Sequence, residues 1–372
     1  MGEGSQGRRN QAGVIAGGLP EGPAPTLQHG VSGIRIVQLL FPDSRSAHLD
    51  IEAEVTEGKA VLLNPRQTRF EAIDRSAWEN AHAIIVRNLP IDAAVIKHLK
   101  QARIVVRNGV GYDIVDLKGC GEQGIAVCNV PDYGTTEVAD TAIAMMLTFA
   151  RGTAVLDTAL RANIRDNWTH TPNVTARRLR GACFGVIGLG RIGTAAALRA
   201  RAFGMNVVFY DPFLPNGAEL AVGLSRALKL QDLMNVADVV SIHTPLTEET
   251  QGMINAQLID HAKPGLFLIN TARGPICDTA AVLDGLFRGK LGAVGLDVLP
   301  TEPPRLEDPL VAAWYANEPP VRGRILLNPH AAFYSPDSLV DLRRKAVETA
   351  YYYLRDGKLT NCVNSEYLRS PR

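Results

Sequence analysis

The chain has 372 residues, which is too long for one typical hydrophobic core and predicts two domains. It carries 39 Lys and Arg residues against 38 Asp and Glu, a formal net charge of +1. This balance excludes the basic surface of a protein that binds nucleic acids or anionic membranes. The longest apolar stretch, residues 141–150, is far shorter than the roughly 20 residues of a membrane span. We therefore expect neither a nucleic-acid nor a membrane partner.

The cysteines form no C-x-x-C pair and no zinc-binding spacing, so we predict no metal site. The five cysteines are Cys120, Cys128, Cys183, Cys277 and Cys362. Three of them, Cys128, Cys183 and Cys277, stand in apolar or tightly packed sequence, where a small buried thiol is the ordinary explanation. Cysteines without a pairing pattern favour a reducing compartment, and we expect a cytoplasmic location.

The first 32 residues differ in composition from the rest of the chain. They are rich in Gly, Pro and small polar residues and show no sustained hydrophobic period. We predict that residues 1–32 are a disordered leader. They lack the apolar core of a secretory signal.

From residue 34 onward, short apolar runs alternate with helical segments, the pattern of a parallel α/β sheet. This first sheet carries no dinucleotide fingerprint. It is followed by a long helix, residues 135–152, that is apolar over much of its circumference, so it is either buried or packed against another subunit. The last long helix, residues 338–356, is expected to return to the first sheet, so that the intervening domain is an insertion.

Residues 184–211 read as a nearly complete dinucleotide-binding unit. Gly188 permits the tight turn out of a strand, Gly190 lets the backbone approach a pyrophosphate, and Gly193 lets the helix pack on the sheet. The free N–H groups at the start of that helix favour an anion. The predicted elements are a strand at 183–187, a helix at 192–203 and a strand at 206–210.

Asp211 follows the glycines at about the spacing of a ribose-binding carboxylate. A carboxylate there accepts hydrogen bonds from ribose hydroxyls and repels a 2′-phosphate, so we predict NAD as the cofactor. The alternative is a turn aspartate before Pro212.

Beyond the fingerprint, three strand-end segments each supply one polar residue suited to reducing a keto acid. His330 can give a proton to the oxygen that becomes negative when hydride reaches the carbonyl carbon. Glu302 can orient His330 and stabilise its charged form, and Arg273 can hold a carboxylate in two-point geometry and polarise the carbonyl.

Each of these three residues also has an ordinary explanation when taken alone. His330 could cap a strand end, Glu302 could be a loop charge before prolines, and Arg273 could contact a helix terminus. Their joint placement after a dinucleotide fold favours the catalytic interpretation.

The motifs GLGRIG…YD, HTPLTEET, NTARG, GLDV, TEP and NPHAA resemble, in this order, the D-2-hydroxyacid dehydrogenase family. Within it, RIVVRNGVGYDIVD, GIAVCNVPDYGTTEVAD and LTNCVN are most similar to the C-terminal-binding protein branch, the NAD(H)-dependent corepressors. The resemblance implies an α/β fold with two parallel-sheet domains. A Rossmann NAD-binding domain, residues 136–334, is expected to be inserted into a flavodoxin-like substrate domain, residues 33–135 and 335–372.

The resemblance also assigns roles to matching positions. It implies that Arg273, Glu302 and His330 are the substrate arginine, the orienting glutamate and the acid/base histidine. The implied cofactor-binding residues are Gly188, Gly190, Arg191, Ile192, Gly193, Asp211, Thr244, Pro245, Thr271, Ala272 and Asp297, the last of them toward the nicotinamide carboxamide. The implied substrate-binding residues are Arg107, Val110, Gly111 and Phe333. For Arg107, an exposed arginine on a sheet edge is the alternative.

Three positions depart from the pattern of the resembling branch. Phe333 stands where a Trp is typical, which predicts a somewhat larger substrate pocket. Ile114 replaces a common Asn, and Cys277 a common Val. Glu302 itself argues against formate dehydrogenase, which resembles this family but has Gln at that position.

Two functions follow as hypotheses. The first is an NAD-dependent oxidoreductase that interconverts a small 2-keto acid and a D-2-hydroxy acid. The alternative is an NAD(H)-sensing corepressor that binds short peptide motifs and has a nuclear location. The resemblance implies a homodimer, for which the apolar helix at residues 136–152 is the candidate interface.

Overall fold

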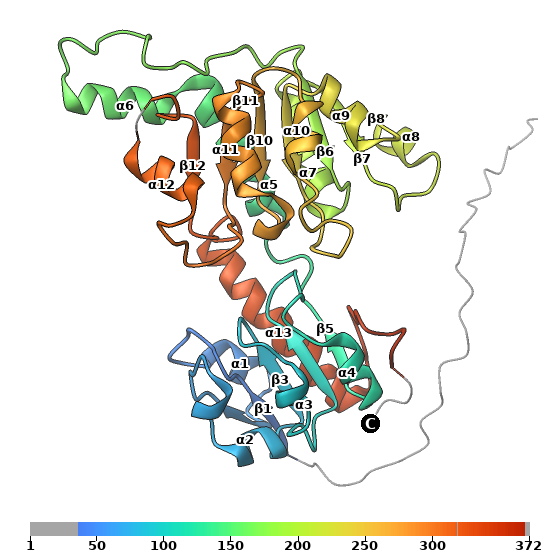
Figure 1. Cartoon of the computed structure of the whole chain (residues 1–372). Coiled ribbons are helices and arrows are strands. Elements are labelled where there is room, and N and C mark those ends of the chain that lie inside the picture. The colour runs from blue at the N-terminus through green and yellow to red at the C-terminus, as the bar shows by residue number, and fades with distance from the viewer. Residues whose placement is uncertain (1–35, 318, 369–372) are drawn as a thin grey trace, which may run out of the picture. The chain divides into compact units, whose positions relative to one another are not determined.

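The computed structural model describes residues 36–317 and 319–368. The predicted leader, residues 1–32, lies outside the described residues. From Val37 on, the described residues form one compact unit that contains two separate sheets, and all pairs of neighbouring strands in both are parallel (Figure 1). The predicted α/β class with two parallel sheets is confirmed.

The first sheet has five strands in the order β2-β1-β3-β4-β5. This is the order of flavodoxin-like folds. Its strands are β1 (Val37–Leu40), β2 (Ala60–Leu63), β3 (Ala83–Val86), β4 (Ile104–Arg107) and β5 (Ala126–Cys128). All four residues of β3 are buried, because helices cover both faces of the sheet.

Helices α1 (Asp50–Val55) and α13 (Pro336–Asp356) cover one face of the first sheet, and their apolar side chains share a core with Leu39, Ile85 and Val106. The opposite face packs against α2, α3 and α4 through residues that include Trp78 and Val95. The bounds of these helices are α2 (Arg75–Asn80), α3 (Ala93–Ile96) and α4 (Leu117–Glu122), with a short 3-10 turn at Phe70–Ala72. Because α13 packs on β3 and β4, the end of the chain returns to the first sheet.

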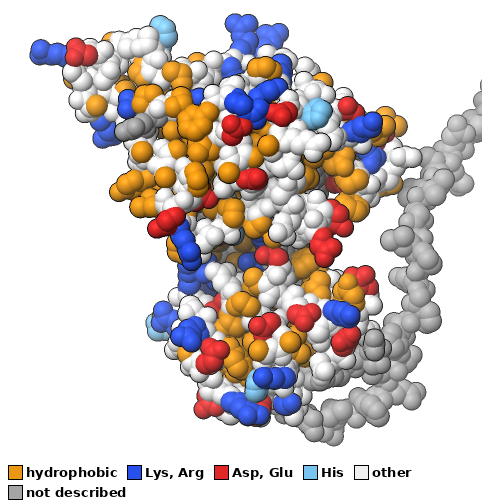
Figure 2. Space-filling view, in the orientation of Figure 1, with side chains coloured by type: hydrophobic (Ala, Val, Ile, Leu, Met, Phe, Trp, Pro, Cys, Tyr) orange, Lys and Arg blue, Asp and Glu red, His pale blue; other side chains and the backbone are white. Residues whose placement is uncertain are grey.

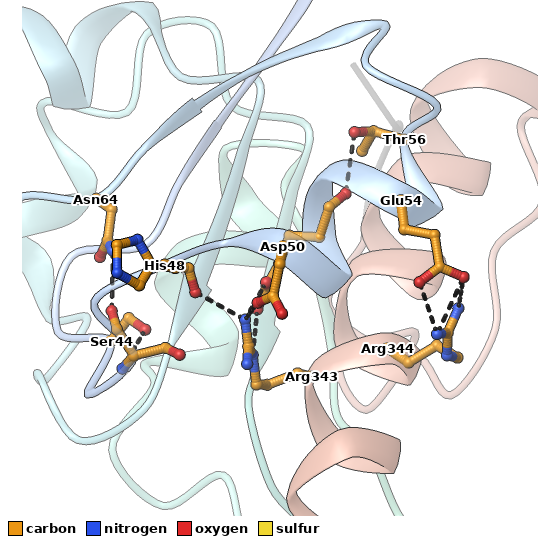
Figure 3. Close-up of polar contacts among 10 residues, drawn as sticks. Ser44, His48, Asp50, Glu54, Thr56, Asn64, Arg343 and Arg344 are labelled. Atoms are coloured by element: carbon orange, nitrogen blue, oxygen red, sulfur yellow. Dashed lines mark hydrogen bonds and ion pairs between the residues drawn. The ribbon is translucent and has the colours of Figure 1, made fainter.

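Two arginines of α13 hold α1 in place, as Figure 3 shows. Arg343 donates to both carboxylate oxygens of Glu52, at 2.6 and 2.8 Å, and also to Asp50 and to the carbonyl of His48. The Glu52 side chain is only 3% exposed, so Arg343 compensates a buried charge. Arg344 pairs with Glu54, whose side chain is 66% exposed.

The second sheet has seven strands in the order β12-β11-β10-β9-β6-β7-β8. The glycine fingerprint follows one of its inner strands, as in a Rossmann fold. The strands are β6 (Cys183–Ile187), β7 (Asn206–Tyr210), β8 (Ser225–Arg226), β9 (Val239–Ile242), β10 (Leu266–Asn270), β11 (Leu291–Leu296) and β12 (Ile325–Leu327).

Two helical layers enclose this second sheet. Its helices are α5 (Thr135–Arg151), α6 (Thr153–Ala162), α7 (Arg191–Ala202), α8 (Ala218–Val222), α9 (Leu230–Val236), α10 (Ala256–Asp260), α11 (Thr279–Phe287) and α12 (Pro309–Ala316), with a 3-10 turn at Gly274–Ile276. Residues of α5 and α7 share one core with Phe184 and Phe267, and residues of α9 to α12 share the other with Ile242 and Leu268. The exact domain bounds stay a prediction.

The apolar helix predicted at 135–152 is α5, and it is explained by packing within the chain. Eight of its residues are buried, and the helix lies against α7, β10 and β11. Gly152, in the left-handed conformation, ends α5, and a separate helix, α6, begins at the next residue. Among the described residues no single helix has the length and apolar composition of a membrane span; only α5 and α6 taken together, bent by 54°, meet that test.

Candidate functional site

The carboxyl ends of the strands in both sheets open onto a cavity of about 1220 Å³. Parallel sheets bind ligands at this edge, where the strand order reverses. The predicted site residues that line the cavity are Arg107, Val110, Gly111, Gly190, Arg191, Ile192, Thr244, Pro245, Thr271, Ala272, Arg273, Asp297, Glu302, His330 and Phe333. Gly188, Gly193 and Asp211 do not line it.

The three fingerprint glycines have different structural roles. Gly188 has a φ of +88°, and an added Cβ would lie 2.8 Å from the Thr244 side chain. A Cβ on Gly193 would lie 2.0 Å from the Gly188 carbonyl oxygen, so these two glycines are needed for the turn itself. An added Cβ on Gly190 would meet no protein atom within 4 Å, and this residue faces the cavity. Gly190 therefore keeps space open for a ligand.

The surroundings of Gly190 fit the phosphates and polar groups of a dinucleotide. Gly190 precedes α7 and provides no side-chain cap, so the first N–H groups of this helix are available to an anion. The hydroxyls of Thr244 and Thr271 are buried without a hydrogen-bond partner in the described chain, and both residues line the cavity. Because buried polar groups normally have partners, these hydroxyls are suited to a polar ligand.

Asp211 supports the glycine turn directly. One carboxylate oxygen accepts the Leu189 N–H at 2.9 Å and the other accepts the Phe213 N–H at 3.0 Å. The turn role that was the alternative interpretation is thus present in the structure. Ribose recognition by the remaining lone pairs of Asp211 stays a prediction.

His330 and Glu302 form a close pair at the cavity. His330 Nδ1 lies 2.7 Å from Glu302 Oε2, and the other Glu302 oxygen accepts the Leu299 N–H at 3.1 Å. Burial alone would raise the pKa of Glu302, but the hydrogen bond and charge of His330 outweigh it and hold that pKa below its ordinary value. Glu302 is therefore ionised near neutral pH and can orient the ring of His330.

The loop that carries His330 is held by Asp297, which follows β11. The Asp297 carboxylate accepts the N–H groups of Ala331 and Ala332 at 2.9 to 3.0 Å, and its backbone carbonyl accepts the His330 N–H at 2.8 Å. His330 itself has a φ of +52°, a conformation that is uncommon for a non-glycine residue. These bonds fix the backbone that presents the imidazole. A contact of Asp297 with a nicotinamide stays a prediction.

Arg273 reaches from the second sheet to the first. Its Nε donates to Asp113 Oδ1 at 2.9 Å and its Nη1 donates to the Ala272 carbonyl. A Cβ on Gly111 would lie 1.4 Å from Arg273 Nη2, so Gly111 leaves the space that the guanidinium occupies. Burial would raise the pKa of Asp113, but the charge of Arg273 holds it below the ordinary value. Sequence reasoning missed Asp113 because its partner is 160 positions away.

The cavity is richer in arginines than the sequence indicated. Arg107 faces it, and burial, followed by the charge of Arg273, lowers its pKa to about 10. The Arg107 Nε has no hydrogen-bond partner in the described residues. Arg45 and Arg87 also line the cavity. Arg87 directly follows β3, so the rule that ligands bind at strand ends could have identified it.

With Arg191 and Arg273, five arginines line the cavity against three carboxylates, those of Asp113, Asp297 and Glu302. The chain as a whole has a net charge of only +1, and Figure 2 shows charges of both signs interspersed on the face in view. The positive charge is therefore concentrated locally, where it attracts an anion.

His243 and Tyr133 complete the cavity and were not predicted. His243 Nε2 lies 2.9 Å from the Ser241 hydroxyl, and burial lowers the pKa of His243 to about 4, so it is neutral near pH 7. The Tyr133 ring contacts Phe333 with centroids 5.9 Å apart. In residues 36–317 and 319–368, no group of three or more His, Cys, Asp or Glu side chains is arranged to hold a metal ion.

At one cavity, a Rossmann-type sheet with an open glycine loop meets a histidine–carboxylate pair and an arginine cluster. This combination is typical of the class of dinucleotide-dependent proteins that bind small anions. Residues 143–332 match the family model "D-isomer specific 2-hydroxyacid dehydrogenase, NAD binding domain". The chain belongs to the D-isomer specific 2-hydroxyacid dehydrogenase family. The predicted family is confirmed, and the cofactor is a nicotinamide dinucleotide.

Of two similar proteins, one is named as a C-terminal-binding protein and the other as a dehydrogenase. The chain is 30% identical over 350 residues to C-terminal-binding protein 1 of Caenorhabditis elegans, covering 92% of this chain and 46% of that protein. It is 36% identical over 229 residues to D-3-phosphoglycerate dehydrogenase of Mycobacterium leprae (strain TN), covering 61% and 42%. The chain thus spans less than half the length of these relatives.

One similar solved structure matches this chain over nearly the whole length of both proteins. The D-lactate dehydrogenase of Aquifex aeolicus, complexed with NAD and lactic acid, has a TM-score of 0.72 and 27% identity. The match covers 85% of this chain and 95% of that one. Similarity to the C-terminal-binding protein branch is confirmed, whereas the roles of individual site residues remain predictions.

Proposed function

We propose that the chain is an NAD(H)-dependent oxidoreductase that interconverts a 2-keto acid and a D-2-hydroxy acid. The observation that carries this proposal is the 2.7 Å pair of His330 and Glu302 in the same cavity as Arg273 and the open face of Gly190. When bound, the nicotinamide supplies the chemistry of hydride transfer to and from the substrate carbon. A proton donor and a carboxylate-binding cation are the other requirements of the reaction.

The residues of the chain meet these requirements as follows. His330, with Nδ1 engaged by Glu302, has Nε2 left to donate a proton to the substrate oxygen and to take it back in the reverse direction. Glu302 stabilises the charged imidazole and fixes its orientation. Arg273 uses Nε on Asp113, which leaves Nη2 to bind the substrate carboxylate. The backbone at Val110 and Gly111 borders the same space.

The substrate's far end is proposed to carry a second negative charge. Arg45, Arg87 and Arg107 line the cavity in addition to Arg273, and one cation is enough for the carboxylate next to the reacting carbon. The similarity to D-3-phosphoglycerate dehydrogenase supports a substrate with a phosphate or a second carboxylate. An apolar 2-keto acid would leave the Nε of the desolvated Arg107 without a hydrogen-bond partner.

The preference for NAD(H) over NADP(H) rests on Asp211, a carboxylate at the end of β7. It repels a 2′-phosphate by like charge. We expect the ratio of kcat/KM for NADH to that for NADPH to exceed one in the native chain and to fall in Asp211→Asn.

The test is a substrate panel with purified chain and NADH. The panel contains 2-keto acids that end in a methyl group, an isopropyl group, a carboxylate or a phosphate, and His330→Ala is measured in parallel. Turnover that depends on His330 and is fastest for dianionic acids supports the proposal. No turnover with any acid, or equal turnover by His330→Ala, would disprove it. Chiral analysis of the product then establishes whether it is the D-isomer.

The similarity to C-terminal-binding protein 1 of Caenorhabditis elegans favours a second candidate, an NAD(H)-sensing corepressor that binds short peptides. This candidate includes a nuclear location, whereas the oxidoreductase is proposed to be cytoplasmic. Titration of the chain with short peptides, with and without NADH, separates the two. NADH-dependent peptide binding in a chain that lacks turnover would favour the corepressor.

A homodimer is also proposed. Most apolar residues of α5 are buried within the chain, so they leave little surface for an interface. Apolar side chains instead gather over the α6 and α12 region (Figure 2). Exposed apolar residues include Ile164 and Trp168 in the segment that follows α6, and Tyr315 in α12. Trp168 is 77% exposed. Sedimentation of the native chain and of Trp168→Ser tests this: a dimer that weakens in the variant is expected, and a native monomer would contradict it.

A further inference from the structure

The segment after α13 lies along the edge of the first sheet and brings two cysteines opposite each other. Val363 donates its N–H to the Val127 carbonyl at 2.8 Å, and Asn129 donates to the Asn361 carbonyl at 3.3 Å. These bonds flank an antiparallel bridge between Cys128 of β5 and Cys362. This is the non-hydrogen-bonded type of antiparallel pair, with Cα atoms about 4.5 Å apart and side chains close together.

Both cysteines are free, and the Cys362 thiol donates a hydrogen bond to the side-chain oxygen of Asn364 at 3.4 Å. A disulfide needs Cα atoms roughly 4.4 to 6.8 Å apart, which a non-hydrogen-bonded pair meets. The position is fixed by Asn364, whose side chain bonds to Val127, Ile125 and Leu117. The two sulfurs are therefore held together by the backbone of both segments.

We propose that Cys128 and Cys362 are an oxidation site, at which a peroxide converts the two thiols into a disulfide that fastens the C-terminal segment to β5. The two cysteines differ in the way that such a site requires. Cys362 is half-buried and reachable, whereas Cys128 is fully buried. The interaction between the two neighbouring thiols lowers the pKa of Cys362 to about 6 and raises that of Cys128. Cys362 is thus the thiolate that attacks.

The reaction balances with hydrogen peroxide as the oxidant. The Cys362 sulfur attacks one peroxide oxygen, the O–O bond breaks, and the other oxygen leaves as water with the thiol proton, which gives a sulfenic acid. The Cys128 sulfur then attacks that sulfur, the S–O bond breaks, and the hydroxyl leaves as a second water with the Cys128 proton. Two thiols lose two electrons, and one peroxide is reduced to two waters.

The remaining cysteines lack this arrangement. Cys120 and Cys277 are buried, and burial raises the pKa of each thiol to about 12. Cys183 is half-buried like Cys362, but burial raises its pKa and it has no thiol partner among the described residues. Cys183 is therefore the matched control for exposure without pairing.

The experiment uses the full chain, reduced, freed of reductant and treated with an equimolar amount of hydrogen peroxide. Remaining thiols are alkylated, and tryptic peptides are analysed by mass spectrometry without reduction. The peptide that begins at Leu359 is expected to be linked to the peptide of residues 119–151. Because that second peptide also holds Cys120, the measurement is repeated in a Cys120→Ser background. The link is expected to disappear in Cys362→Ser and to persist in Cys183→Ser.

Two further readouts distinguish pairing from general oxidation. The oxidised chain is expected to unfold at a higher temperature than the reduced chain, because the disulfide closes most of the sequence into one loop. Cys128→Ser is expected to leave Cys362 as a sulfenic acid without an internal link. A native chain whose Cys362 stays a sulfenic acid without linking, or whose only disulfides involve other cysteines, would overturn the proposal.

Discussion

Arg273 Nε donates to Asp113 Oδ1 at 2.9 Å, and this ion pair joins a loop of the second sheet to a loop of the first. The Arg273 side chain is 21% exposed and that of Asp113 is 35% exposed, so the pair is only partly screened by water. The geometry leaves Arg273 Nη2 beside Gly111. The carboxylate-binding group of the second sheet is thus oriented by the first.

The first prediction concerns this orientation. Asp113→Ala removes the acceptor of a charged hydrogen bond, which is worth roughly 1.5 to 3 kcal/mol, so kcat/KM is expected to fall by about tenfold or more. Asp113→Asn keeps an oxygen acceptor and is expected to lose less. Steady-state kinetics with the best 2-keto acid of the panel measures both. Equal kcat/KM in Asp113→Ala and the native chain would show that Arg273 is positioned without Asp113.

A second prediction separates the two roles of the fingerprint glycines. Gly190→Ala adds a Cβ into open space, so the melting temperature is expected to stay unchanged while NADH binding weakens at least tenfold. Gly193→Ala places its Cβ 2.0 Å from the Gly188 carbonyl oxygen and is expected to lower the melting temperature. Thermal unfolding and NADH fluorescence titration measure the two effects. Native NADH affinity in Gly190→Ala would contradict the proposed path of the phosphates.

The third prediction tests Glu302 as the positioning residue for His330. Glu302→Gln keeps a hydrogen-bonding group next to Nδ1 but removes the negative charge. The charged imidazole then loses its stabilising partner, and kcat is expected to fall by about 100-fold while KM changes little. Steady-state kinetics separate kcat from KM, and thermal unfolding is the control for a structural effect. Native kcat in Glu302→Gln, or a loss of kcat accompanied by a lowered melting temperature, would mean that the carboxylate serves only the local fold.

The fourth prediction concerns stability, far from the cavity. Arg343→Ala leaves the buried carboxylate of Glu52 without its partner, and the free energy of unfolding is expected to fall by about 3 to 5 kcal/mol. Arg344→Ala is the matched control, because Glu54 is exposed and the expected loss is below about 1 kcal/mol. Urea unfolding measures both variants. Similar losses in the two would show that burial of Glu52 does not determine the effect.

The fifth prediction is a pH dependence of stability. The pKa of His243 is about 4 in the folded chain, below its ordinary value of 6.5, so the unfolded chain binds the proton more tightly. This contribution to stability is present above pH 6.5 and is lost as pH falls toward 4. A pKa shift from 6.5 to about 4 corresponds to a loss of about 3 kcal/mol in the free energy of unfolding. The expected loss is smaller than this, because the His243 side chain is only partly buried. His243→Gln is expected to show a shallower decline in urea unfolding between pH 7 and 4. An unchanged slope would assign the decline to other groups.

Elements with local sequence signals were predictable from the amino-acid sequence. The alternation of apolar runs and helices predicted the two parallel sheets, and the spacing of Gly188, Gly190 and Gly193 predicted the dinucleotide turn. The bounds of the helix after this turn were predicted to within one residue, since the turn fixes where α7 begins. The family motifs predicted the residues that line the second sheet's side of the cavity.

Contacts between residues far apart in the chain became evident from the folded structure alone. Arg45, Arg87 and Asp113 reach the cavity from the first sheet, and no spacing in the sequence links them to Arg273. In the sequence, the apolar residues of α5 fit an intrachain core and a subunit interface equally well. In the structure, α7 and β10 cover most of them. The pairing of Cys128 with Cys362 likewise depends on where the last segment folds back. The physical reason is that local propensity acts over a few residues, whereas packing, charge and thiol contacts depend on the path of the whole chain.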